Sequence, residues 1–445
     1  MIISGHKNRF TVVLIALVLA VTLASCGKDK KNQGRIKGER IPIITTEGDI
    51  AIDEATAGLP ILLPRPYVNP NWGQPGGNPA NLVHHPAVAD SLTLAWKVKI
   101  GEGSKKYKKL VAGPVVWEGV VYTMDTKGQV SAFSTDDGRS LWRTRLESEE
   151  EKSRIAYGGG VTYWGGRIFA TTGYCFIAAL DARTGAEIWR TTIGVPLRGA
   201  PTAAGGRVFV NTQDNQLVVM TAATGEIEWE HFGIVENAEI LGSASAAVQG
   251  DTVIAAFSSG ELYALRVQNG QVSWQDTLSR TGRLTALATL NDIDGQPVIY
   301  RGRIYAGNHS GRLVAVDMRS GDRIWENNIG TLYTPWIAGD YMFILNLEGE
   351  VIAVSIADGR ARWITQLERF EKHKKRKDLI RWAGPILAGD RLFVVSSHGY
   401  MLTLSPYTGK ILSGIKLPGG TVISPVVADR TVYVLTDEGD LAAYR

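Results

Sequence analysis

The stretch "ALDARTGAEIW", Ala179 to Trp189, places a glycine directly after a turn residue and a tryptophan four positions after that glycine. The same turn recurs along the chain at spacings of 38 to 51 residues. Its copies are Gly138/Trp142, Gly185/Trp189, Gly225/Trp229, Gly270/Trp274, Gly321/Trp325 and Gly359/Trp363, and a seventh, "TGKILS", has Ser413 in place of the tryptophan. A spacing this regular indicates one supersecondary unit repeated along the chain.

Each repeat also carries short apolar runs upstream of this turn. "PVIYRGRIYAG" and "GRLVAV" are examples, and glycine-bearing turns separate the runs. Three strands therefore precede the repeated turn and a fourth contains the tryptophan. A period of about 40 to 50 residues with four strands per unit is typical of a β-propeller blade. We expect the large flat indole to fill the space between neighbouring blades.

The two ends of the chain complete one further blade. After the seventh turn, three strand-like runs lead to Arg445, where a fourth strand would be needed. "LTLAWKVKI", which contains Trp96, supplies a strand of the required type near the other end. The sequence therefore predicts an all-β, eight-bladed propeller that is closed by pairing this N-terminal strand with the last three.

The N-terminal region has a composition of its own. Basic residues precede an apolar run from Phe10 to Leu23 that is too short to span a bilayer, which predicts a signal peptide over 1–25. "LASC", ending at Cys26, resembles the bacterial lipobox and implies lipidation of that cysteine. Residues 26–88 are rich in proline and predict a periplasmic tether, although Tyr67 and Trp72 indicate that its later part lies against the body. The propeller is expected over 89–445.

The motif in "ALDARTGAEIW" and "AVDMRSGDRIW" resembles the tryptophan motif of quinoprotein-type propellers. Together with the lipobox and eight compact blades, the chain resembles the BamB family, lipoprotein subunits of the machinery that assembles β-barrel proteins in the bacterial outer membrane. The resemblance implies a non-catalytic scaffold without a cofactor, lipid-anchored at the periplasmic face of the outer membrane. It also implies binding to the POTRA repeats of BamA, to other subunits of the machinery and to unfolded outer-membrane proteins.

"NDIDGQP" contains two aspartates, Asp292 and Asp294, whose role residue type alone leaves open. A calcium loop of EF-hand type fails on spacing, because Leu290 and Arg301 would stand where oxygen ligands are required. The repeat register puts the pair on a crossover between blades, on the same face as the crossover "GVPLRGAP". By resemblance, Asp292 and Asp294 on one crossover and Val195, Leu197 and Arg198 on the other contact BamA.

Other functions find less support in the sequence. Residues 51–445 carry equal numbers of acidic and basic residues, so nothing favours nucleic acid. No histidine spacing indicates a metal site. A periplasmic oxidoreductase of quinoprotein type remains an alternative, although the adjacent cysteines of those enzymes are missing. A module binding cell-envelope polysaccharide, suggested by Tyr157, Tyr163 and Trp164, is a third possibility.

Two basic stretches and one cysteine complete the candidates. The crossovers at 104–109 and 372–377 could attract anionic partners, but solvated charge is the simpler interpretation. Cys175, in "YCFIAAL", is expected to be a small buried core residue.

Overall fold

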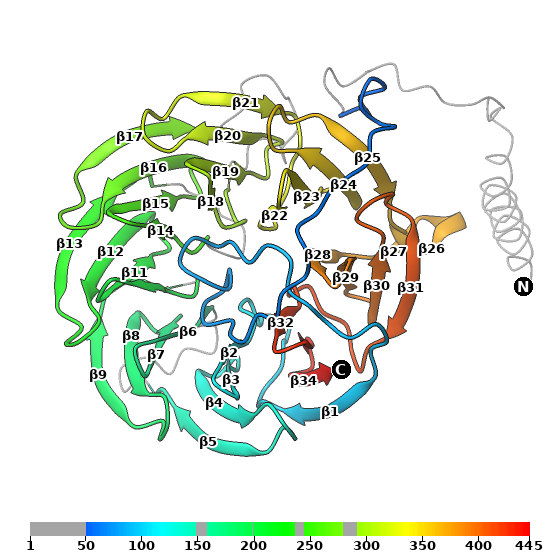
Figure 1. The fold of residues 1–445 in the computed structure, drawn as a ribbon. Helices are drawn as coiled ribbons and strands as arrows, with labels where there is room; N and C mark the ends of the chain where they lie inside the picture. The colour runs from blue at the N-terminus through cyan, green and yellow to red at the C-terminus, as the bar shows by residue number, and fades with distance from the viewer. Residues whose placement is uncertain (1–49, 148–157, 198, 236–243, 279–291) are drawn as a thin grey trace, which may run out of the picture. The chain divides into compact units, whose positions relative to one another are not determined.

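The computed structural model describes residues 50–147, 158–197, 199–235, 244–278 and 292–445. Within these residues, eight four-stranded antiparallel sheets are arranged around a common centre, as Figure 1 shows. The predicted all-β, eight-bladed propeller is therefore confirmed. Blades 1 to 8 are numbered here in chain order.

The strands of a blade run outward from the centre in chain order, and blade 8 combines both ends of the chain. Blades 1 to 3 are β2 (Val115–Trp117), β3 (Val120–Met124), β4 (Gln129–Ser134), β5 (Ser140–Arg145); β6 (Gly159–Trp164), β7 (Arg167–Thr172), β8 (Phe176–Asp181), β9 (Glu187–Thr192); β10 (Thr202–Ala204), β11 (Arg207–Asn211), β12 (Gln216–Thr221), β13 (Ile227–Phe232). Blades 4 to 6 are β14 (Ala247–Gln249), β15 (Thr252–Ala256), β16 (Glu261–Arg266), β17 (Val272–Thr277); β18 (Val298–Tyr300), β19 (Arg303–Gly307), β20 (Leu313–Asp317), β21 (Arg323–Asn327); β22 (Trp336–Ala338), β23 (Tyr341–Leu345), β24 (Glu350–Ser355), β25 (Ala361–Gln366). Blade 7 is β28 (Trp382–Ala388), β29 (Arg391–Ser396), β30 (Tyr400–Leu404), β31 (Ile411–Lys416), and blade 8 is β32 (Val426–Ala428), β33 (Thr431–Leu435), β34 (Asp440–Tyr444) with β1 (Leu94–Lys99).

Burial along a blade follows from the stacking of sheets face to face. The four central residues of β12 are buried, because both faces of this middle strand lie against neighbouring blades. The outermost strand β9 instead alternates exposed and half-buried residues, as a sheet edge does. Cys175 does not lie in the core as expected: it occupies the turn between β7 and β8, half-buried, with a φ of 64°.

The ring closes through the two ends of the chain, as the repeat predicts. Strand β1 pairs antiparallel with β34, with Trp96 opposite Ala443. Beyond the strands, Thr93 and Arg445 exchange two backbone hydrogen bonds of 2.7 and 3.0 Å. These bonds close the blade and leave no open sheet edge between the first and last strands.

The glycine and the tryptophan of the repeat meet across blade boundaries. The indole of Trp142 lies against Gly185 of the next blade so closely that a Cβ there would come within 2.5 Å of the ring. Gly185 also has a φ of 74°, a conformation that disfavours side chains. Each indole Nε1–H donates to a carbonyl of the same turn: Trp96 to Thr135 (2.7 Å), Trp142 to Ala182 (2.9 Å), Trp189 to Ala222 (3.1 Å), Trp229 to Val267 (3.0 Å), Trp274 to Met318 (2.9 Å), Trp325 to Ile356 (3.0 Å) and Trp363 to Pro406 (3.0 Å).

The exception at Ser413 has a structural reason. A tryptophan there would have to reach the turn between the third and fourth strands of blade 8. That turn does not exist, because β34 and β1 come from opposite ends of the chain. Neither the glycine nor the acceptor carbonyl is available at this one junction, and Ser413 instead shares a hydrogen bond of 2.7 Å with Thr403 of its own blade.

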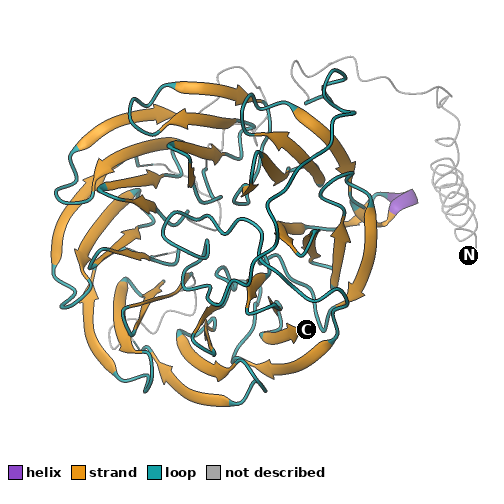
Figure 2. Ribbon diagram, in the orientation of Figure 1, coloured by secondary structure: helices purple, strands orange, loops and turns teal. Residues whose placement is uncertain are grey.

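The segment before the first blade belongs to the same compact unit as the blades, Gly48–Arg445. We call residues 69–86 the hub segment. Figure 1 shows it in blue across the centre of the ring, and Figure 2 shows it as loop. Its residues hydrogen-bond to all eight blades, through Val116 (2.7 and 2.8 Å), Tyr163 (2.7 Å), Ala203 (2.7 and 3.2 Å), Val248 (2.7 Å), Ile299 (3.1 Å), Trp336 (2.7 Å), Gly389 (2.9 Å) and Asp429 (2.7 Å).

Apolar and polar contacts both hold the hub segment. Trp72 is 3% exposed and stacks on Trp336 of blade 6, with ring centroids 6.0 Å apart. The ring of His85 is fully buried: Nδ1 lies 2.7 Å from the carbonyl of Pro64, and Nε2 accepts the Asp390 N–H at 2.9 Å. Of the two aromatic residues that argued against a freely solvated tether, Trp72 is thus packed against an innermost strand, whereas Tyr67 is 44% exposed.

Candidate docking face

The crossovers between blades emerge on the face opposite the hub segment. Each complete blade alternates strand direction, so crossovers and the turns between its second and third strands share one face. The turns between first and second strands lie at the other face, where Asn71 of the hub segment accepts the Glu118 N–H at 2.8 Å. We call the first of these the crossover face.

A cavity of about 490 Å³ lies at the centre of the crossover face. The last residues of the crossovers form its walls, and the hub segment contributes Trp72 and Val83. The lining is mainly apolar, with Lys109, Asp294 and Arg381 among its charged groups. We call this cavity the central funnel.

The crossover from blade 2 to blade 3 carries three of the predicted docking residues. Val195 is half-buried, but Leu197 is fully buried in a core cluster with Phe169 and Val218. The Leu197 N–H donates to the carbonyl of Thr172 at 3.2 Å, which ties the crossover to its own blade. Arg198 lies outside the described residues.

The crossover from blade 4 to blade 5 carries the two aspartates. Asp292 is 2% exposed, and its carbonyl accepts the His309 N–H at 2.9 Å. Asp294 is half-buried and lines the central funnel. Gly295 lies between the two aspartates and blade 5. A side chain does not fit there, because a Cβ at this position would come within 2.6 Å of the Tyr333 carbonyl.

Tyr333 contributes to the electrostatics of the funnel wall beside Asp294. Burial raises the pKa of the Tyr333 phenol to about 12, and the Asp294 carboxylate acts in the same direction. The positive charge of Arg381 lowers the Tyr333 pKa and so opposes these two effects. Tyr333 therefore stays neutral at physiological pH, and the wall carries fixed charges of both signs.

The predicted docking residues differ in how far they are exposed. Leu197 and Asp292 are buried within the propeller itself. Of the two aspartates, only Asp294 lines the central funnel. The structure does bring the two crossovers together, since Gly199 and Asp294 line the same funnel.

The crossover between these two, from blade 3 to blade 4, was missed by the sequence analysis. It presents Phe232, Ile234 and Val235, which are 62%, 61% and 67% exposed. Hydrogen bonds hold this apolar loop in place: Asn215 Nδ2 donates to the Ile234 carbonyl at 2.6 Å, and the Ile234 N–H donates to Glu261 at 2.7 Å. The signal was available in "HFGIVE", where apolar residues continue after the outermost strand ends.

Glu261 is the buried support of this apolar loop. Glu261 is 6% exposed. Its carboxylate also accepts hydrogen bonds from Ser259 (2.8 Å) and Tyr263 (2.7 Å). Burial, together with the bond to Glu261, raises the pKa of Tyr263 to about 12. Three donors thus satisfy a carboxylate that would otherwise be costly to bury.

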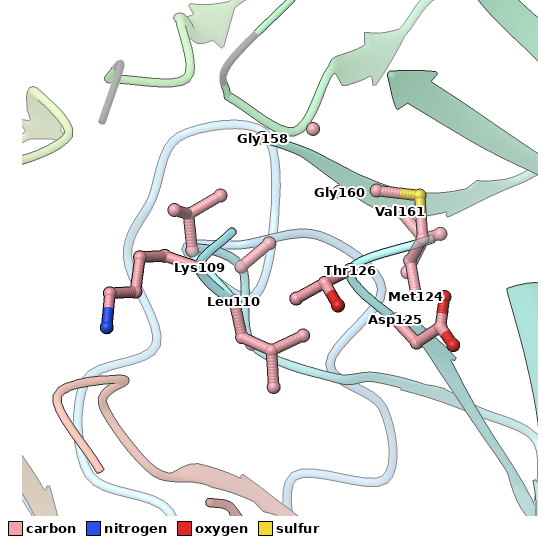
Figure 3. A pocket seen from close by; sticks show the side chains of 12 residues that line it. Lys109, Leu110, Met124, Asp125, Thr126, Gly158, Gly160 and Val161 are labelled. Carbon is pink, nitrogen blue, oxygen red and sulfur yellow. The ribbon is translucent and has the colours of Figure 1, made fainter. Parts of the chain in front are cut away.

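A second, much smaller cavity lies between the crossovers that flank blade 1. Figure 3 shows it lined by Leu110, Asp125, Thr126 and Gly160, with the Lys109 side chain extending away from Asp125. Its volume of about 10 Å³ is close to what a single water molecule needs. It is too small for an organic ligand.

The described part of the chain shows neither a metal site nor a membrane span. No group of three or more His, Cys, Asp or Glu side chains in it is arranged to hold a metal ion. None of its helices is long and apolar enough to cross a membrane.

Comparison with known proteins identifies the family. The family model described as "Outer membrane protein assembly factor BamB" matches residues 88–155, 127–365 and 370–445. The chain belongs to the BamB family. Among curated relatives, BamB of Moranella endobia is 24% identical over 357 residues, covering 78% of this chain and 89% of that protein. BamB of Yersinia pestis is 25% identical over 362 residues, covering 80% and 89%.

Solved structures share the fold. The crystal structure of BamB from Moraxella catarrhalis matches with a TM-score of 0.67 and 20% identity, covering 80% of this chain and all of that one (100%). Quinohemoprotein alcohol dehydrogenase from Comamonas testosteroni matches with a TM-score of 0.64 and 15% identity, covering 84% and 80%. At these identities the likeness concerns the fold alone.

The BamB family match begins at residue 88, so the hub segment lies outside it. Two of the three aromatic residues that suggested polysaccharide binding make contacts within the chain. Tyr163 is half-buried and stacks on Trp117 at 4.6 Å, and Trp164 is half-buried against a core cluster. Tyr157 lies outside the described residues.

Proposed function

We propose that this BamB-family chain is a non-catalytic scaffold of the outer-membrane β-barrel assembly machinery, and that it docks on the POTRA repeats of BamA through its crossover face. The observation that carries the proposal is the apolar loop Phe232, Ile234 and Val235. It lies between the two crossovers on which the resemblance places the contacts. Exposed apolar side chains rimmed by polar residues are typical of protein interaction sites.

The docking residues divide into two groups. Val195, Arg198, Ile234, Val235 and Asp294 contact BamA: the aliphatic side chains provide apolar area, Arg198 donates, and Asp294 accepts hydrogen bonds from a basic surface. Leu197 and Asp292 hold the backbones of their crossovers. Preorganised loops bind with less loss of conformational entropy, which is the advantage of anchoring them to the blades.

In this proposal the chain also has partners other than BamA. The other subunits of the machinery and unfolded outer-membrane proteins are the further partners, held near one another by the propeller. The chain is attached to the periplasmic face of the outer membrane through a lipidated Cys26. Replacement of this residue, Cys26→Ser, is expected to move the protein from the membrane fraction to the soluble periplasmic fraction, as measured by fractionation and immunoblotting.

The docking proposal is tested by affinity capture of BamA with purified variants. Ile234→Asp/Val235→Asp is expected to weaken capture at least tenfold, because it places two charges in an apolar contact. Arg198→Ala and Asp294→Ala should each weaken it less. Leu412→Asp provides the matched control, since Leu412 is 54% exposed on the outermost strand of blade 7. Undiminished capture by the Ile234/Val235 variant would overturn the proposed interface.

A further inference from the structure

A basic hairpin is inserted in the crossover from blade 6 to blade 7. It consists of β26 (Phe370–Lys372), the short 3₁₀ turn η2 (His373–Lys375) and β27 (Lys377–Leu379), with Lys372 paired opposite Lys377. Figures 1 and 2 show it extending outward past β31. The Arg376 N–H donates to the His373 carbonyl at 3.2 Å and closes the tip.

The hairpin holds more cations than acids. Its two acids are already engaged, Asp378 with Lys372 at 2.6 Å and Glu371 with His398 at 2.5 Å. No ion pair found among the described residues includes Lys374, Lys375, Arg376 or Lys377, and all four side chains are exposed. The tip is therefore a fixed cluster of four positive charges facing solvent.

Apolar groups lie at the base of the same hairpin. Leu379 is 59% exposed, and the Arg376 guanidinium lies 5.9 Å from the centroid of the Phe370 ring. Cations at a tip with exposed apolar side chains behind them suit a lipid surface, where phosphates lie outside the acyl chains.

The N-terminal segment meets the propeller on blade 6, the blade that the hairpin follows, although at the opposite end of β25. Ile52 forms a parallel bridge with Ala361, and the Asp53 N–H donates to the Ala361 carbonyl at 3.0 Å. The chain therefore joins the propeller at the first residue of β25, and the hairpin begins shortly after the last. A six-residue strand is about 20 Å long. The chain from Cys26 to Ile52 spans at most about 90 Å, so the hairpin is within reach of a membrane holding that cysteine.

We propose that this hairpin binds the anionic phosphate headgroups of the lipid bilayer and thereby orients the propeller on the membrane. The proposal rests on the proposed function for the lipid attachment that brings the membrane close, and it is independent of docking to BamA. One lipid anchor at the end of a long tether limits the distance between a protein and a membrane but leaves its orientation free. A second contact through Lys374, Lys375, Arg376 and Lys377 fixes which rim of the propeller faces the bilayer.

The test is flotation of the mature chain carrying Cys26→Ser, so that no acyl chain contributes, with two kinds of vesicle. The chain is expected to bind vesicles containing phosphatidylglycerol and to bind vesicles of phosphatidylcholine alone at least tenfold more weakly. Binding to the anionic vesicles should fall as salt is raised. Inorganic phosphate at constant ionic strength should leave it unchanged, whereas competition by phosphate would show a simple anion site and overturn the proposal.

Two variants that each remove three lysines separate this site from general electrostatic attraction. Lys374→Ser/Lys375→Ser/Lys377→Ser is expected to weaken binding to anionic vesicles at least tenfold. Lys105→Ser/Lys106→Ser/Lys108→Ser, in the other basic crossover, should change it less than threefold. Equal losses in both variants, or none in the first, would overturn the proposal.

Capture of BamA by the same hairpin variant distinguishes a lipid from a protein ligand. The expected result is normal capture together with lost vesicle binding. Lost capture with normal vesicle binding would assign the hairpin to a protein partner and overturn the proposal. If the chain captures no BamA at all, the proposed function fails while the vesicle result still stands. Circular dichroism of both variants checks that the fold is intact.

Discussion

The rim and the hub of this propeller hold the same eight blades together in different ways. At the rim, one interaction is repeated at seven junctions: an indole packs on a glycine and donates to a carbonyl of the next blade. At the hub, residues 69–86 make a different hydrogen bond with each blade. Rim contacts join only neighbours, whereas the hub joins all blades through one segment. Removal of a hub side chain should therefore lower the free energy of unfolding more than removal of a rim tryptophan.

The largest effect is expected from Trp72→Ala in the hub. Trp72 is 3% exposed, stacks on Trp336 and lies in the segment that exchanges backbone hydrogen bonds with Val116. Loss of a buried tryptophan side chain lowers the free energy of unfolding by about 4 kcal/mol. Urea denaturation measures the change. Leu62→Ala is the control in the same N-terminal region, because Leu62 is 74% exposed and its loss should cost less than about 0.5 kcal/mol.

A smaller loss is expected at the rim from Trp189→Ala. This indole is half-buried, donates to Ala222 at 3.1 Å and lies on Gly225. We expect a cost of about 2 kcal/mol in urea denaturation, since partial burial reduces the loss. Trp189→Phe keeps an aromatic ring and removes the donor, so it should cost about 1 kcal/mol. If Trp189→Ala cost as much as Trp72→Ala, the distinction between rim and hub would be wrong.

Two glycines of blade 3 separate backbone conformation from packing at the rim. Gly225 has a φ of 76° and a Cβ there would come within 2.5 Å of the Trp189 ring, whereas Gly206 has a φ of 82° and open space around it. In both variants the new alanine must adopt a left-handed backbone conformation, which costs about 1 kcal/mol of stability. Gly225→Ala should cost about 1 kcal/mol more, because the indole must move. Equal costs by urea denaturation would mean that the indole contact is not what requires glycine.

The hub should respond to acid, whereas the rim contacts contain no group that titrates near neutral pH. Burial lowers the pKa of His85 from its usual 6.5, although the Pro64 carbonyl and the Asp390 carboxylate oppose the shift. Tyr407, hydrogen-bonded to Asp390, is the other titratable neighbour. Below about pH 6.5 the unfolded chain binds a proton that the folded chain does not. The free energy of unfolding should therefore fall as the pH is lowered.

The measurement is urea denaturation between about pH 8 and about pH 5, for the wild type and for His85→Gln. The variant should be less stable at pH 8 and should lose less stability on acidification. Burial also lowers the pKa of His84 and His231, so part of the slope will remain in the variant. An unchanged slope in His85→Gln would show that this residue does not link the hub to pH.

The sequence predicts the rim well and the hub poorly for the same physical reason. A repeated contact leaves a repeated pattern, so Gly185 and Trp189 could be read from spacing, and Trp96 could be matched to the closing strand. Each hub contact occurs only once, so it leaves no repeated pattern. The stretch "VNPNWGQPGG" shows that Trp72 is too apolar for a solvated tether. Nothing in that stretch shows which carbonyl accepts the hydrogen bond from Gln74.

At the candidate site, the register located the crossovers of Leu197 and Asp294 but could not show which side chains are buried. Leu197 and Asp292 required three-dimensional packing to be assigned to the interior. The exposed Ile234 and Val235 are apolar residues outside the repeat, so periodicity does not single them out. The positions of the crossovers along the chain can be derived from the periodicity of the repeat. The burial of a side chain on a crossover depends on neighbours that are distant in sequence.

The smallest effect is expected where the rim pattern is broken. Ser413→Trp restores the consensus residue of the repeat, and a sequence-based argument would expect it to stabilise the chain. Ser413 is exposed, and the turn that would supply the glycine and the carbonyl is replaced by the paired ends at Thr93 and Arg445. We therefore expect a change of less than about 0.5 kcal/mol in urea denaturation. A gain of about 1 kcal/mol or more would mean that the indole stabilises a blade junction without its glycine and acceptor.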